Sequence, residues 1–105
     1  MSTGIRLIWS PEARKDLLDI YVVIGNDSPA AAERFYTAIE NKAEALVRHP
    51  RLGPRRPDIG ASARVLVEGP YLILFETVPD TDEGPIERVE ILRVIDGHRD
   101  VKNLF

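Results

Sequence analysis

Three basic side chains near the predicted strands are the residues of this chain best suited to chemistry on a phosphate. Arg64 opens a strand-like run, Arg93 interrupts an apolar run at 91–95, and His98 follows Gly97. Two guanidinium groups on neighbouring strands could converge on one phosphate, and an imidazole can exchange a proton near neutral pH. Cleavage of a phosphate ester would need such cations together with groups that activate the attacking oxygen and protonate the leaving oxygen. These residues are therefore the candidates for a site that holds a phosphate.

The acid–base groups for that reaction are poorly supplied. No tyrosine follows Tyr71, and Lys102 is the only lysine beyond it. A histidine just after a glycine is more often a surface residue than a catalyst. For the two arginines the alternative is an outward-facing side chain paired with a glutamate, such as Glu90 or Glu68. The sequence therefore favours action by binding over catalysis.

The charge of the chain points the same way. The formal net charge is −3, whereas dedicated nucleic-acid binders usually carry a strong positive excess. Positive charge is local, because residues 48–64 hold five arginines against one aspartate, a net charge of +4. This segment is either a solvated arginine-rich loop or a patch that faces an acidic partner.

Several other classes of site are not supported. The chain has no cysteine and two histidines, so we expect no disulfide, no metal and no cofactor. Asp80, Asp82 and Glu83 resemble part of a calcium loop, but the glycine and closing glutamate have the wrong offsets, which indicates a solvated hairpin tip. Neither a signal-peptide pattern nor an apolar run of about 20 residues is present, so a cytoplasmic location without membrane contact is expected.

Two Ser-Pro pairs define the elements that must position these residues. Ser10-Pro11 and Ser28-Pro29 each supply an N-cap followed by an N1 proline. Apolar residues at helical spacing predict helices that end near 25–26 and before His49-Pro50. Strands are predicted at 5–9, 63–68, 71–77 and 86–95. The order β-α-α-β-β-β predicts a single α+β domain over 1–105, with a helical hairpin packed on one face of a mostly antiparallel sheet.

The first predicted helix has more apolar residues than one buried stripe needs. Leu18, Val22 and Val23 lie off its main apolar face. They either pack beneath the loop at 49–62 or remain exposed for an amphipathic partner helix. The second alternative makes them candidates for a protein interface.

Two segments resemble the signatures of a known family. The segments WSPEARKDLLDIYVVI at 9–24 and ILRVIDGHRD at 91–100 resemble the opening and closing motifs of the ParE branch of the ParE/RelE toxin superfamily. The resemblance covers nearly the whole chain. That branch more often has Leu-His-Gly or Ile-His-Gly where this chain has Ile95-Asp96-Gly97. Asp96 is thus a departure, and it puts in doubt any role that a histidine there would carry.

The resemblance implies the toxin of a type II toxin–antitoxin, or plasmid stabilisation, module. Its implied target is DNA gyrase, poisoned by binding, with no DNA binding by the toxin alone. A ParD-like antitoxin is the implied partner, in a hetero-oligomer, and Leu18, Val22 and Val23 are the candidates to contact it. The candidates to contact the target are Arg64, Arg93, His98 and Arg99.

Two alternatives remain at this point. A RelE-like, ribosome-dependent mRNA endonuclease would use Arg64, Arg93 and His98 as its catalytic residues. A degenerate toxin would keep antitoxin binding and lack the poison, which the departure at Asp96 makes worth considering. The shared fold does not separate these functions, so the site must.

Overall fold

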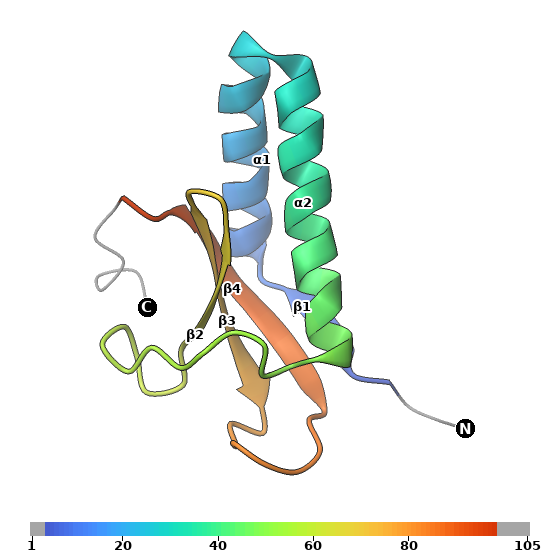
Figure 1. Ribbon diagram of the computed structural model, residues 1–105, viewed down its shortest axis with the longest axis vertical. Helices are drawn as coiled ribbons and strands as arrows, with labels where there is room; N and C mark the ends of the chain where they lie inside the picture. The colour runs from blue at the N-terminus through green and yellow to red at the C-terminus, as the bar shows by residue number, and fades with distance from the viewer. Residues whose placement is uncertain (1–3, 99–105) are drawn as a thin grey trace.

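The structure is a computed structural model, and it describes residues 4–98 (Figure 1). Its order of elements confirms the predicted α+β arrangement of a helical hairpin and four strands. The strands and helices are β1 (Arg6–Trp9), α1 (Pro11–Asp27), α2 (Pro29–Arg48), β2 (Arg64–Glu68), β3 (Tyr71–Val78) and β4 (Arg88–Asp96).

Serine caps shape the helical hairpin. Ser10 Oγ accepts a hydrogen bond from Ala13 N at the start of α1. Ser28 serves both helices, because its N–H donates to Ile24 O and its side chain accepts from Ala31 N. A single residue therefore joins α1 to α2, and α1 runs to Asp27, slightly beyond its predicted end. Such a short connection forces the two helices into an antiparallel pair.

The sheet has the order β1-β4-β3-β2. β3 pairs antiparallel with both β2 and β4, whereas β1 pairs parallel with β4. The β1 register ends at the pair Trp9–Ile91, although β4 continues to Asp96. Opposite the Leu74–Phe75 step of β3, Leu92 is an extra residue on β4 that forms a bulge. The second half of β4 therefore has no β1 partner on its outer side.

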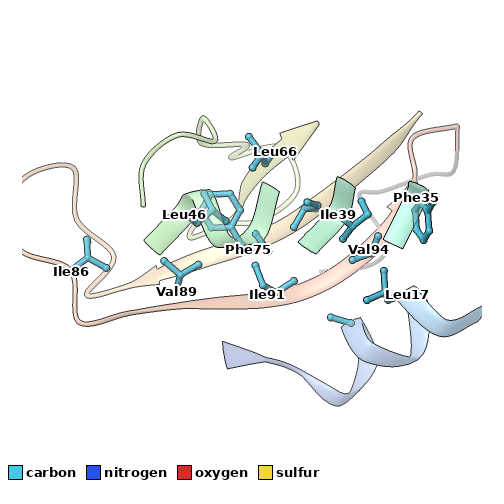
Figure 2. Close-up of a cluster of buried hydrophobic side chains, with 13 residues drawn as sticks. Leu17, Phe35, Ile39, Leu46, Leu66, Phe75, Ile86, Val89, Ile91 and Val94 are labelled. Atoms are coloured by element: carbon cyan, nitrogen blue, oxygen red, sulfur yellow. The ribbon is translucent and has the colours of Figure 1, made fainter. Parts of the chain in front are cut away.

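The main core lies between the helical hairpin and the sheet (Figure 2). Ile39 and Leu46 of α2 meet Ile73 and Phe75 of β3 there, and all four are fully buried. Alternation along β3 places Leu74 on the opposite face. On that face Leu74 packs with residues of the β2 strand and the preceding loop in a second, smaller cluster: Ile59, Ala63 and Val65. The loop after α2 therefore forms a third layer over part of the sheet.

Within the described residues, neither helix is long and apolar enough to cross a membrane.

Close packing at Gly53 yields a first prediction. A Cβ atom on Gly53 would lie 2.6 Å from Phe75 Cε1 and 2.6 Å from Val65 O, too close for either the ring or the backbone to accept without movement. We expect Gly53→Ala to lower the free energy of unfolding by about 1–3 kcal/mol, measured by urea denaturation. Gly4→Ala is the matched control, because a Cβ there meets nothing within 4 Å. Equal unfolding midpoints for the two variants would contradict this packing.

Candidate functional site

Arg93 is held by a carboxylate from α1. Its Nε lies 2.7 Å from Asp16 Oδ2 and its Nη2 lies 2.9 Å from Asp16 Oδ1, a bidentate pair. The backbone N–H of Val94 also donates to Asp16 Oδ2, at 3.0 Å. The hydrogen bond to Asp16 raises the pKa of Arg93, so the guanidinium stays charged. Three donors therefore converge on one carboxylate.

The start of α1 brings Asp16 to this position. Ser10 N–H donates to Ile91 O at 2.9 Å, and Ser10 Oγ donates to Leu92 O at 2.8 Å. These bonds fix the first turn of α1 beside the part of β4 that β1 leaves unpaired. Asp16 then caps the next exposed donor of that edge, the Val94 N–H. The predicted partners of Arg93, Glu90 and Glu68, are wrong, because the partner is Asp16 on a helix.

Arg64 is a buried residue at the start of β2. It is only 4% exposed. Its Nη1 donates to Gly53 O at 3.2 Å, and its Nη2 donates to Asp82 Oδ1 at 3.1 Å, while Nε is buried without a hydrogen-bond partner. Burial, together with the positive charges of Arg55 and Arg51, lowers the pKa of Arg64. The predicted glutamate partner is therefore wrong here too, because Arg64 turns inward and binds an aspartate.

The basic loop finds its acidic partner within the same chain. Arg55 binds Asp80 at 2.8 Å and Asp82 at 2.7 Å, and both carboxylates belong to the loop between β3 and β4. Arg51 donates hydrogen bonds to the same loop, at Thr81 and at the carbonyl oxygen of Gly84. The expectation that Asp80, Asp82 and Glu83 form a solvated hairpin tip is confirmed, because all three are exposed, and Asp80 and Asp82 in addition join this network. Much of the local +4 charge is thereby compensated inside the molecule.

The two candidate arginines do not share a partner. Arg64 binds the β3–β4 loop through Asp82, whereas Arg93 binds α1 through Asp16. The structure therefore gives no support to the expectation that both guanidinium groups converge on one phosphate. Each arginine instead connects the sheet to a different neighbouring segment.

His98 is exposed and contacts Asp96. The exposed fraction of its side chain is 86%. Asp96 Oδ1 accepts a hydrogen bond from His98 N at 2.9 Å and lies 2.8 Å from His98 Nδ1. Asp96, the departure from the family motif, thus shapes the turn that follows β4. Arg99, the fourth residue predicted to contact a target, lies outside the described residues.

The apolar residues of α1 are open to solvent. Leu18, Val22 and Val23 are 60%, 51% and 67% exposed. The alternative that they pack beneath the loop at 49–62 is therefore wrong. That loop instead covers the opposite face of the sheet, where Ile59 packs against Leu74. The outer face of α1 is an exposed apolar strip of the kind that often marks a protein interface.

Sequence reasoning missed the two carboxylates that organise these residues, Asp16 and Asp82. A partial signal exists for Asp16, which borders the buried positions Ala13 and Leu17 on α1, while Arg93 interrupts an apolar strand. An acidic residue beside a buried stripe and an isolated strand arginine suggest a pair. Asp82 has no comparable signal, because its partners are set by loop geometry. Among residues 4–98, no group of three or more histidine, cysteine or acidic side chains could hold a metal.

Comparisons with known proteins identify the fold and the family of the chain. A solved structure titled "Chromosomal ParDE TA system from P. aeruginosa" has a similar fold, with a TM-score of 0.70 and 23% sequence identity over 90% of this chain and 98% of that chain. No curated protein sequence matches the chain. The family model for the ParE toxin of the type II toxin–antitoxin system parDE matches residues 7–101. The chain therefore belongs to the ParE toxin family of type II toxins.

The Asp16 contacts yield a second prediction. Asp16→Asn keeps the shape of the side chain but leaves the partly buried Arg93 guanidinium without its counter-charge. We expect the free energy of unfolding to fall by about 2 kcal/mol, less than for a fully buried pair because water screens part of the charge. Urea denaturation measures this change. The control is Asp19→Asn, one turn further along α1, where the exposed pair with Lys15 contributes little. Equal losses in both variants would contradict the role given to Asp16.

The loop network yields a third prediction, for pH. Hydrogen bonding to Arg55 holds the pKa of Asp82 below its usual 3.8, and Arg64 adds to the effect. A carboxyl group with a lowered pKa stabilises the folded state above its unfolded pKa, and this stabilisation is lost as the pH falls through the folded value. We expect the thermal midpoint to drop as the pH falls below about 4, and Asp82→Asn and Arg55→Gln each to reduce that drop. If the thermal midpoints of both variants fall with pH as steeply as that of the natural chain, this assignment is wrong.

Proposed function

We propose that this chain acts as a toxin that binds and poisons DNA gyrase, and that a ParD-like antitoxin neutralises it. One observation supports action by binding: Arg64 and Arg93 are both already paired within the chain. The two guanidinium groups best placed to hold a phosphate are each occupied by a carboxylate of the same chain. Membership of the ParE toxin family supports the gyrase target.

The same contacts weigh against a ribonuclease. Cleavage of mRNA would require Arg64, Arg93 and His98 to surround one phosphate. Arg64 is buried against the β3–β4 loop, and Arg93 faces α1. An acidic chain would also be repelled at long range by ribosomal RNA. These features support a protein that acts by occupying a surface of its target.

We place the target-binding surface at the end of β4. His98 is exposed there, directly before Arg99 in the sequence. Both side chains carry donors that suit an acidic protein surface. Direct contact of Arg64 and Arg93 with the target stays a prediction. In the described conformation these two arginines instead position the β3–β4 loop and the edge of β4.

The antitoxin surface lies on the outer face of α1. Leu18, Val22 and Val23 are spaced along about one and a half turns of the helix and are more than half exposed. An amphipathic helix of the antitoxin could bury this strip, in the manner of helix-in-groove recognition. The expected complex is a hetero-oligomer in which the toxin keeps its own fold.

The fourth prediction tests the toxin itself. Induction of the chain alone in a bacterium should cause filamentation and a DNA-damage reporter signal while protein synthesis continues. Purified chain should also raise the amount of cleaved DNA trapped by gyrase. Rapid translation arrest with cut mRNA, abolished by His98→Ala, would instead make the chain a ribonuclease. The absence of any effect at good expression, with no trapped cleavage by purified gyrase, would favour a degenerate toxin.

The same assay separates the two surfaces. Val22→Glu places a charge in the exposed apolar strip without touching the core. This variant should remain toxic, but the ParD-like antitoxin should no longer rescue growth. Thr37→Glu, on α2, is the matched control and should be rescued like the natural chain. Equal rescue of both variants would contradict the antitoxin surface on α1.

A further inference from the structure

Val67 is the most exposed large apolar side chain among the described strands of the sheet. Its exposed fraction is 55%, although its neighbours Val65 and Leu66 in β2 are buried. Leu66 belongs to the main core beneath the helical hairpin, and Val65 belongs to the second cluster on the opposite face. Because side chains alternate along a strand, Val67 shares the face of Val65 and points away from the hairpin. Neither the hairpin nor the loop over Val65 covers it.

An apolar row connects Val67 to the end of β4. Val67 lies opposite Leu72 of β3, and Leu72 lies opposite Ile95 of β4. Opposite residues share a face, so these three side chains cross the sheet on the face that points away from the hairpin. Neighbouring strands are about 4.8 Å apart, so the row spans about 10 Å. It therefore runs from the exposed Val67 to the last residues of β4.

The turn between β2 and β3 is joined to the chain that leaves β4. Gly97 N–H donates to Pro70 O at 2.7 Å. A Cβ atom on Gly97 would lie 3.0 Å from the same oxygen, so a larger residue would require the two segments to move apart. Both segments lie at the same end of the sheet (Figure 1). His98 follows Gly97 directly, so Val67 and His98 border the same end of the sheet.

Leu52 extends the exposed apolar surface beyond β2. An antiparallel bridge joins Arg55 to Arg64, the first residue of β2. Continued by three residues, this register places Leu52 beside Val67. Leu52 is 50% exposed, a fraction close to that of Val67. We call Leu52 and Val67 together the β2 apolar pair.

The charge on the Leu52 side of this pair is positive. Arg51 precedes Leu52, and its hydrogen bonds go to neutral groups, Thr81 and the carbonyl oxygen of Gly84. Arg48 is exposed in the last turn of α2. Among the described residues, neither arginine forms an ion pair with a carboxylate. The β2 apolar pair therefore suits a protein surface that combines an apolar contact with carboxylates.

The position of the pair favours the target as its partner. Val67 points away from the helical hairpin, whereas the strip that we assign to the antitoxin lies on the outer side of that hairpin. The apolar row leads instead to the residues before His98, which we assign to the target. A standard interface covers about 800 Å² of each partner, so a protein that contacts His98 also reaches this row.

We propose that the β2 apolar pair is part of the target-binding surface and packs against an apolar patch of gyrase that is bordered by carboxylates. Leu52 and Val67 supply the apolar contact, and Arg51 and His98 supply donors at its edges. This inference rests on the proposed function. It makes Val67 a specificity-determining residue, because a target with a carboxylate at the centre of the patch would have to bury that charge against a valine.

The test compares two valine-to-glutamate changes, one on each surface of the full chain. The first readout is the cleaved DNA that purified gyrase accumulates on closed circular DNA, and the second is calorimetric binding to the purified ParD-like antitoxin. Val67→Glu should need about tenfold more toxin for half-maximal cleavage, the effect of losing one well-packed interface contact, and should bind the antitoxin like the natural chain. Val22→Glu is the matched control and should show the reverse. Leu52→Glu should resemble Val67→Glu.

The outcomes separate this inference from the proposed function. If the natural chain causes cleavage and the Val67→Glu and Leu52→Glu variants do so at the same concentration, the inference is wrong and the proposed function stands. If the natural chain causes no cleavage, both fail. Weaker antitoxin binding by Val67→Glu, with or without a loss of cleavage, would also overturn the inference. Circular dichroism and thermal unfolding check that the variants are folded, and Leu52→Glu decides the matter if Val67→Glu is not.

Discussion

The carboxylate of Asp16 is the contact on which the arrangement of this toxin depends. The sheet has a strand, β4, whose outer side is paired with β1 for only part of its length. An unpaired strand edge in a folded protein needs its donors satisfied and its charges compensated. Asp16 does both, because one carboxylate accepts the Val94 N–H and both arms of the Arg93 guanidinium. The helical hairpin is thereby oriented against the sheet.

A second group of charged residues holds the loop between β3 and β4 in place. Arg51, Arg55 and Arg64 come from the loop after α2 and from β2, and all three bind the loop between β3 and β4. Arginine is suited to this work, because its fork of donors can bind carbonyls and carboxylates together. A cluster that the composition suggests as a surface for an outside partner is therefore used mainly inside the molecule.

The regular elements could be predicted from the sequence because their signals are local. Ser10-Pro11 and Ser28-Pro29 mark helix starts to within one residue, and the apolar runs locate the strands. The pairing of Arg93 with Asp16 and of Arg64 with Asp82 could not be predicted, since it depends on how segments far apart in the chain meet. Exposure of Leu18, Val22 and Val23 was one of two alternatives, and only the packed structure decides between them. Local chemistry therefore predicted the scaffold, whereas the site required the tertiary contacts.

The position of β4 within the sheet has a consequence for synthesis. β4 is the last of the described strands to leave the ribosome, yet it lies between β1 and β3, and the contact of Ser10 with Leu92 spans 82 positions. Strand pairing over such separations must await the later partner, and loop closure makes it slow. Until β4 emerges, β1 has no neighbour and the edge that Asp16 caps does not exist. A nascent chain, or one that ends before this strand, therefore lacks the assembled four-stranded sheet.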